Sequence, residues 1–151
     1  MSEHMGEQGM ALGALLAASD QAGAYFADLR DREDLVEAGN ALHYAVVPVD
    51  LRGCDSGPAA LARIAEALRF PEWFGGNWDA LSDCVNDLSW WPSEGYVLVL
   101  EHASDWRTHD RDSFDTALEI LGEASVRWAE DRVPFWTFFP VPTRELEEIG
   151  E

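Results

Sequence analysis

The segment Tyr96–Leu100 (YVLVL) is an unbroken run of apolar residues. This pattern is typical of a strand that is buried on both faces, as in a parallel sheet covered by helices. Two more segments have the composition of buried strands, Tyr44–Leu51 (YAVVPVDL) and Val133–Val141 (VPFWTFFPV), and Ala24–Ala27 is a shorter candidate. The sequence therefore predicts a small, mostly parallel sheet of three to four strands.

Helical patterns lie between the predicted strands. They cover Asp31–Leu42, Pro58–Phe70, Asn77–Leu88 and Phe114–Glu130. Ser56 or Gly57 is expected to cap the second of these helices and Ser113 the last, while His102–Asp112 is expected to be a charged loop. Strands that alternate with helices need crossover connections, which assigns the chain to the α/β class, with helices flanking the sheet.

The length of 151 residues favours a single domain. We expect this domain at residues 21–142, with an extra strand and helix at 21–43. Residues 1–20 are expected to be a flexible N-terminus, and residues 143–151 a frayed, acidic tail. Three leucines near the end of the N-terminal segment indicate a short helix: Leu12, Leu15 and Leu16.

The apolar stretch Ala11–Ala18 is preceded by Glu3 and Glu7, whereas a secretory signal begins with basic residues. No apolar run reaches the roughly 18 residues that a membrane span needs. These features predict a cytoplasmic protein that does not enter a membrane.

Charge is the outlying property of the chain, because 29 Asp and Glu residues against 10 basic ones give a net charge of −19 at pH 7. Such a surface repels nucleic acid and anionic membranes and attracts basic proteins. Cys54, Cys84 and four scattered histidines fit no zinc or redox spacing. Both thiols are therefore expected to be reduced and buried, and no metal or other cofactor is predicted.

The predicted helix Asn77–Leu88 (NWDALSDCVNDL) divides into two faces at 100° per residue. Its apolar face gathers Trp78, Leu81, Cys84, Val85 and Leu88. Its polar face gathers Asp79, Ser82, Asp83, Asn86 and Asp87. Asn77 can cap the helix through its side-chain oxygen, and Gly75 and Gly76 allow a tight turn before it.

The polar face is more acidic than helix stability favours. Between Pro71 and Pro92 the acids are Glu72, Asp79, Asp83 and Asp87, with no basic residue among them. Like charges at i, i+4 cost a few tenths of a kcal/mol per pair, and an arginine opposite one of them would remove that cost. Aromatic residues flank the acids at Trp73, Phe74, Trp90 and Trp91. Acids framed by aromatics indicate a binding surface for a basic protein, and the alternative is a solvated helix face beside core aromatics.

The stretch Phe70–Leu88 (FPEWFGGNWDALSDCVNDL) resembles the signature of the barstar family, intracellular inhibitors of barnase-type ribonucleases. The matching positions are Pro71, Glu72, Trp73, Phe74, Gly75, Asn77, Asp79, Ala80, Leu81, Asp83 and Cys84. The apolar strand that ends at Glu101 also fits, and weaker similarity is collinear from Tyr44 to Val141. The first 40 or so residues look like the extra strand and helix of longer barstar-like proteins.

The resemblance implies a barstar-like fold and an antitoxin or immunity function without enzymatic activity. In the family, the loop and helix plug the active-site cleft of a basic microbial ribonuclease. By that resemblance Asp83 would take the place of a substrate phosphate, Asp79 would pair with a basic residue at the rim, and Trp73 would stack over the catalytic histidine. The implied partner-binding residues are Trp73, Phe74, Gly75, Asn77, Asp79, Ser82, Asp83, Asn86 and Asp87.

Three departures leave the identity of the partner open: Ser82 stands where the family prototype has a large aromatic, Trp73 where it has tyrosine, and Gly76 where it has an acid. The family also uses a glutamate from its last helix region, for which the candidates are Asp110, Asp112 and Glu119. One alternative is a binding module for a different toxin or a regulatory protein. An enzyme that uses Asp79, Asp83 and Glu101 is disfavoured, because no histidine lies near Asp79 or Asp83 in sequence and no glycine-rich phosphate loop is present.

Overall fold

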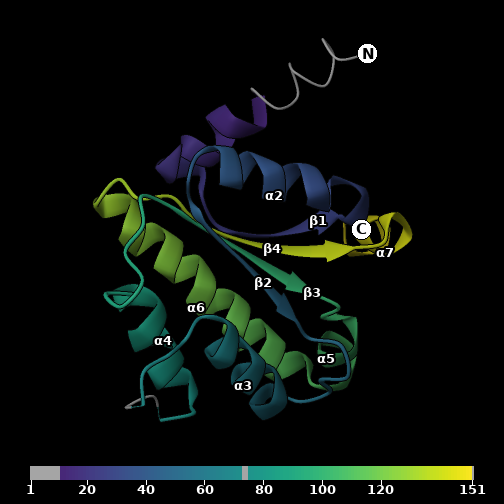
Figure 1. The fold of residues 1–151 in the computed structure, drawn as a ribbon. Coiled ribbons are helices and arrows are strands. Elements are labelled where there is room, and N and C mark those ends of the chain that lie inside the picture. The colour runs from purple at the N-terminus through teal and green to yellow at the C-terminus, as the bar shows by residue number, and fades with distance from the viewer. Residues whose placement is uncertain (1–10, 73–74, 151) are drawn as a thin grey trace.

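The structure is a computed structural model of the chain, and it describes residues 11–72 and 75–150. Four strands form one parallel sheet in the order β1-β4-β3-β2 (Figure 1). They are β1 (Ala24–Asp28), β2 (Ala45–Asp50), β3 (Tyr96–Glu101) and β4 (Phe135–Val141). The predicted α/β class and the mostly parallel sheet are confirmed.

The register of the sheet explains how two of its strands can each contain a proline. Pro48 pairs with Val99, but β2 is an edge strand and Pro48 is exposed, so its missing N–H breaks no central ladder. Pro140 pairs only with Ala27 of β1, because the pairing of β4 with β3 ends at Phe138.

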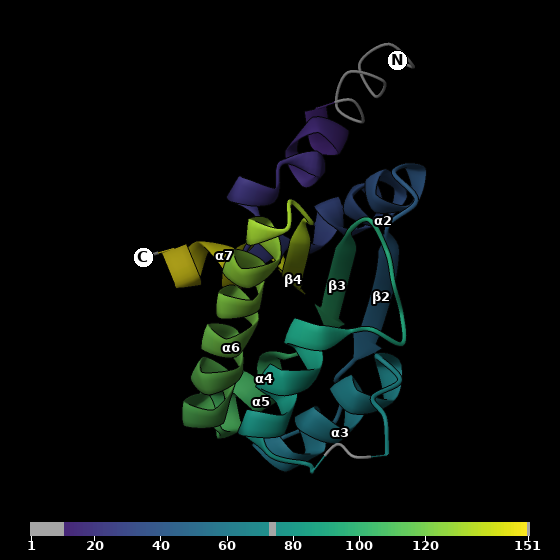
Figure 2. The same cartoon turned by 90° about the vertical axis from the view of Figure 1, so that its left-hand side faces the viewer.

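Helices cover both faces of the sheet (Figures 1 and 2). One face carries α3 (Gly57–Ala67), α4 (Trp78–Asp87), α5 (Ser104–His109) and α6 (Arg111–Glu130). The other face carries α2 (Arg32–Ala41) and the helical residues 11–17. Alternate residues of β3 enter separate cores, with Leu98 on the α4 side and Val97 on the α2 side. Two 3-10 turns, η1 (Ser19–Gln21) and η2 (Leu29–Asp31), flank β1.

The segment His102–Asp112 is not the charged loop that its sequence suggests, because residues 104–109 form α5. The reason is Trp106, which is fully buried and packs its ring edge against Phe114. The predicted cap of α6 is also wrong, since α6 begins at Arg111, before Ser113. The Ser113 hydroxyl instead accepts a hydrogen bond from Trp106 Nε1 at 2.8 Å and donates to the Asp110 carbonyl.

The described residues near both chain ends contain more structure than the sequence suggests. Residues 143–150 form α7 (Thr143–Gly150) rather than a frayed tail, and the Thr143 hydroxyl donates to the Asp28 carboxylate at 2.9 Å. In the segment expected to be flexible, Leu16 is fully buried and its carbonyl accepts a hydrogen bond from Trp136 Nε1 at 3.0 Å. Contacts with distant parts of the chain therefore accompany helical structure at residues 11–17 and 143–150, which local propensity alone does not show.

Candidate partner-binding surface

The N-terminus of helix α4 is capped by a side chain. The Asn77 side-chain oxygen accepts a hydrogen bond from the Ala80 backbone N–H at 2.8 Å, as predicted. Gly76, just before the cap, has a φ of +72°, a left-handed conformation that side chains rarely adopt. This backbone geometry explains why glycine stands at position 76, where an acidic side chain would be strained. The helix ends at Asp87, and the next residue, Leu88, has a φ of +48°.

The apolar face of α4 is fixed to the body of the protein. Leu81, Cys84 and Val85 are fully buried. The Val85 carbonyl, left without an intrahelical partner at the helix end, accepts a hydrogen bond from Trp128 Nε1 of α6 at 2.8 Å. Because both packing and this hydrogen bond hold α4, its outer face is presented by a rigid element.

The tryptophans that follow α4 belong to this framework. Trp90 donates from Nε1 to the Leu68 carbonyl at 3.0 Å, and Trp91 accepts a hydrogen bond from the Tyr96 hydroxyl at its carbonyl, at 2.6 Å. Both rings are half-buried and pack against the core. Their role as anchors for a partner is therefore not supported, and Trp73 and Phe74 lie outside the described residues.

The outer face of α4 carries carboxylates without internal partners. Asp79 and Asp83 are exposed, and neither forms a hydrogen bond or an ion pair with any residue that the structure describes. Five acids elsewhere in the described chain pair with arginine, namely Asp28, Glu101, Asp115, Asp131 and Glu148, whereas Asp79 and Asp83 share their unpaired state with other exposed acids such as Glu33 and Glu37. Asp87 is also exposed, and accepts a hydrogen bond from the Ser89 hydroxyl at 3.2 Å.

The other predicted site residues are used partly within the chain. Asn86 donates its side-chain amide to the Ser82 carbonyl at 2.7 Å and lies 3.3 Å from the Ser82 hydroxyl. This fixes the Asn86 amide and leaves its buried Oδ1 without a hydrogen-bond donor among the described residues. Gly75 is exposed, and the Asn77 side-chain oxygen is already used to cap α4. On the outer face of α4, Asp79 and Asp83 are thus the two carboxylates that no described residue bonds.

Of the three acids considered as additions to this surface, Asp110 has a structural role. Its carboxylate accepts a hydrogen bond from the Gly57 backbone N–H at 2.7 Å, at the start of α3. A hydrogen bond with the Ser113 side chain, and second to it the hydrogen bond from the Gly57 N–H, hold the pKa of the Asp110 carboxyl below its usual range. Asp112 and Glu119 are exposed on α6, and a role for either at the interface stays a prediction.

The three carboxylates that were considered for an enzyme, Asp79, Asp83 and Glu101, do not lie together in one site. Glu101 pairs with Arg32 of α2 at 2.6 Å, on the α2 side of the sheet, whereas Asp79 and Asp83 lie on α4, which covers the opposite face. In the described part of the chain, no group of three His, Cys, Asp or Glu residues is placed to hold a metal ion. Nor is any helix described here long and apolar enough to cross a membrane.

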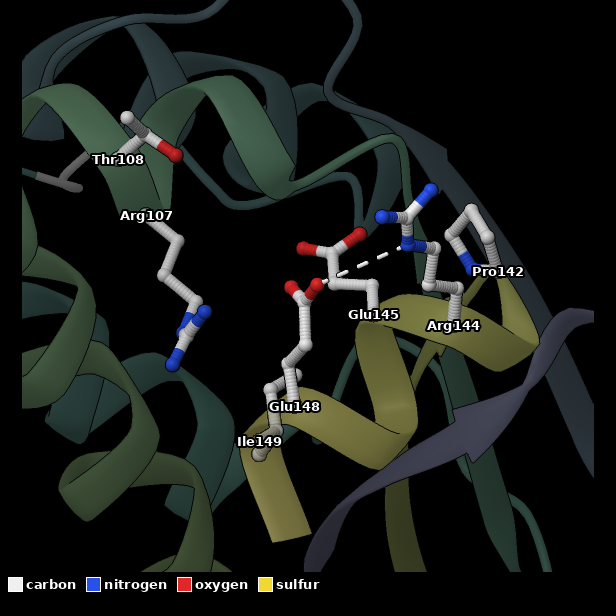
Figure 3. Close-up of a pocket in the computed structure, with 7 residues that line it drawn as sticks. All are labelled: Arg107, Thr108, Pro142, Arg144, Glu145, Glu148 and Ile149. Carbon is white, nitrogen blue, oxygen red and sulfur yellow. Dashed lines mark ion pairs between the residues drawn. The ribbon is translucent and has the colours of Figure 1, made fainter. Parts of the chain in front are cut away.

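A polar cavity of about 500 Å³ lies between α5 and α7 (Figure 3). Arg107 of α5 faces Glu145 and Glu148 of α7 across it. Its charges are of both signs, and Arg144 pairs with Glu148 at 3.9 Å. This cavity therefore offers no concentrated charge of one sign, in contrast to the outer face of α4.

The two cysteines are free and buried, as expected. Burial, reinforced by the charges of Asp83 and Asp87, raises the pKa of Cys84 to about 11. A thiol that stays protonated at neutral pH is a poor nucleophile, so Cys84 acts as a small apolar residue of the core.

Fold and site together define a small parallel α/β protein that presents an unpaired acidic helix face on a rigid framework. The sequence profile described as "Barstar (barnase inhibitor)" matches residues 44–140, and the chain belongs to this family. The match runs from β2 to Pro140 in β4 and includes α4, whereas β1, α2 and α7 lie outside it. No match was found among curated proteins.

Among the solved structures with a similar fold are an ORC2 protein and a Cdc6p. The ORC2 protein of Aeropyrum pernix in ADPNP-ADP complexes matches with a TM-score of 0.59 and 15% identity, over 95% of this chain and 42% of that one. Cdc6p of Pyrobaculum aerophilum matches with a TM-score of 0.57 and 18% identity, over 91% of this chain and 39% of that one. The chain thus spans about two fifths of these structures, and the likeness concerns the fold alone.

Proposed function

We propose that this protein inhibits a basic microbial ribonuclease by placing the outer face of α4 and the preceding loop in the enzyme's active-site cleft. The observation that carries the proposal is the unpaired state of Asp79 and Asp83 on a helix held rigidly from behind. Membership in a family described as barnase inhibitors supports a protein partner of this kind.

The chemistry of inhibition follows from the charge of a ribonuclease site. An enzyme that binds RNA holds phosphate with cationic side chains, and a carboxylate placed among them imitates the charge of the substrate. Because α4 is already ordered, presenting Asp79 and Asp83 costs little conformational entropy on binding. The net charge of −19 steers a basic partner toward the protein over distances set by ionic strength. An inhibitor that protects its own cell would act in the cytoplasm.

A related candidate function is inhibition of a different toxin through the same surface. Ser82 favours it, since a small side chain tied to Asn86 lies between Asp79 and Asp83 on this face. A partner that fits this face needs a surface complementary to the small side chain, so an enzyme other than barnase is a natural target. Both candidates make the same use of the two aspartates.

The test uses the protein and Asp83→Ala as paired baits in extracts of the source organism, with Glu37→Gln as the control. Glu37 is an exposed acid of α2, on the opposite face of the sheet, and its neutralisation removes the same unit of charge. We expect the parent and the control to retain a basic protein with ribonuclease or other toxin activity, and Asp83→Ala to lose it. Equal retention by all three proteins would show that the outer face of α4 is not the binding surface.

A further inference from the structure

The strand β1 is one of the two edges of the sheet. The opposite edge, β2, carries the exposed Pro48, whereas β1 has the sequence AYFAD, with no proline. Thr137 N–H donates to the Gly23 carbonyl, so alternate residues from Gly23 onward face β4. Phe26 therefore directs its backbone N–H and C=O to the free edge, where no described residue bonds to them. An unpaired edge of this kind is a template for one more strand.

A groove of about 530 Å³ lies at the C-terminal half of this strand. Its apolar lining comes from both faces of the sheet: Leu12, Leu35 and Phe138 belong to the α2 side, whereas Phe26 packs toward α6 and Leu146 lies on α7. An extended peptide directs successive side chains to opposite faces, so a strand added to β1 would meet apolar surface with both sets.

The rim of this groove is acidic. Asp31 and Asp34 line it, and neither forms an ion pair with any residue of the described chain. Asp28 also lines it, but Arg30 binds that carboxylate at 3.0 Å. Two unpaired acids beside an apolar floor favour a segment that combines apolar and basic residues. A second copy of this chain is disfavoured, because two bodies of charge −19 repel each other.

The groove belongs to the parts of the chain that the family profile does not match. Apart from Phe138, every residue that lines it lies before residue 44 or after residue 140. These additional segments cover the second face of the sheet and at the same time form this groove. The α4 surface lies on the other face of the sheet, so the two surfaces can be tested separately.

We propose that the free edge of β1 is a second docking site, which takes an extended, basic and partly apolar segment of a partner protein as a fifth strand of the sheet. The added strand would be about five residues long, to match the five residues of β1. Main-chain hydrogen bonds to the edge would hold the segment, and its lysine or arginine side chains would lie near Asp31 and Asp34. This site is independent of the proposed inhibition.

The probe is a fluorescein-labelled six-residue peptide of alternating valine and lysine, whose binding is followed by fluorescence anisotropy. A peptide with N-methyl groups on every backbone amide has the same charge but cannot donate a backbone hydrogen bond along either of its edges. We expect the parent peptide to bind and the N-methylated peptide to bind at least about tenfold more weakly. Equal binding of the two peptides would overturn the proposal, because attraction by charge alone would then explain it.

Matched protein variants test the location of the site. The double variant Asp31→Asn/Asp34→Asn is expected to weaken binding about fivefold. Its control, Glu33→Gln/Glu37→Gln, removes two exposed acids of α2 that do not line the groove, and is expected to bind as the parent does. Equal weakening by both pairs would place the peptide elsewhere. Sedimentation of the free protein as a dimer that the peptide dissociates would make a second copy the occupant, and would also overturn the proposal.

Discussion

Neutralising Asp83 should stabilise the free protein while it weakens the complex. Asp83 lies one turn from Asp79 and one turn from Asp87, so it takes part in two like-charge pairs at i, i+4. Each pair costs about 0.2–0.5 kcal/mol, and the amide of Asp83→Asn removes both at nearly constant helix propensity. The free energy of unfolding should therefore rise by about 0.4–1 kcal/mol, which corresponds to about 1–4 °C in Tm for a chain of this size.

Two further variants fix the sign of this effect. Asp79 belongs to one such pair but lies in the first turn of α4, where the helix dipole favours an acid, so Asp79→Asn should change stability little. Asp115 pairs with Arg111 at 3.0 Å on the exposed side of α6, so Asp115→Asn should lower stability by about 0.3–0.5 kcal/mol.

Urea and thermal denaturation of the free proteins at low salt measure these differences, which should shrink in high salt as charge is screened. A loss of stability in Asp83→Asn would refute the reasoning. It would mean that the Asp83 carboxylate has a stabilising partner within the free protein and is therefore not available, unpaired, for binding.

Three further outcomes follow from the framework around α4. Asn77→Ala removes the acceptor of the Ala80 N–H and should cost about 1 kcal/mol in urea denaturation, whereas Asn77→Ser, which keeps an acceptor, should cost much less. Trp128→Phe leaves the Val85 carbonyl without its donor and should lower the free energy of unfolding by about 1–3 kcal/mol; a variant as stable as the parent would show that this bond does not hold α4. The pKa of Cys84 is raised from 9.0 to about 11, so its stabilising contribution is complete below pH 9 and is lost as the pH rises toward 11. Cys84→Ala should show a shallower loss of stability across that interval, and the native thiol should resist alkylation at pH 8.

Hydrophobic patterning was enough to predict the sheet, because each strand lies between helices and is apolar over most of its length. The cap at Asn77 and the two faces of α4 were also predictable, since they depend on interactions within a few residues. The clustering of acids on that helix could be read from spacing alone.

Features that depend on distant contacts could not be read from the sequence. The short helix α5 exists because Trp106 is buried against Phe114, and Asp110 is used by Gly57, 53 residues away in sequence. The internal bond between Asn86 and Ser82 also escaped prediction, although the i, i+4 spacing of an amide and a serine was a signal that could have revealed it. The groove beside β1 combines residues from both ends of the chain, which no local pattern brings together.

The most direct test of the central claim is a titration of the captured ribonuclease with the purified protein, with RNA cleavage as the readout. The parent and Glu37→Gln should abolish cleavage at one inhibitor per enzyme, with an association rate that falls as salt is added. Asp79→Asn/Asp83→Asn should remain folded and leave most of the cleavage activity at the same ratio. Inhibition by this double variant that equals that of the parent would contradict the claim that the acidic face of α4 blocks the enzyme.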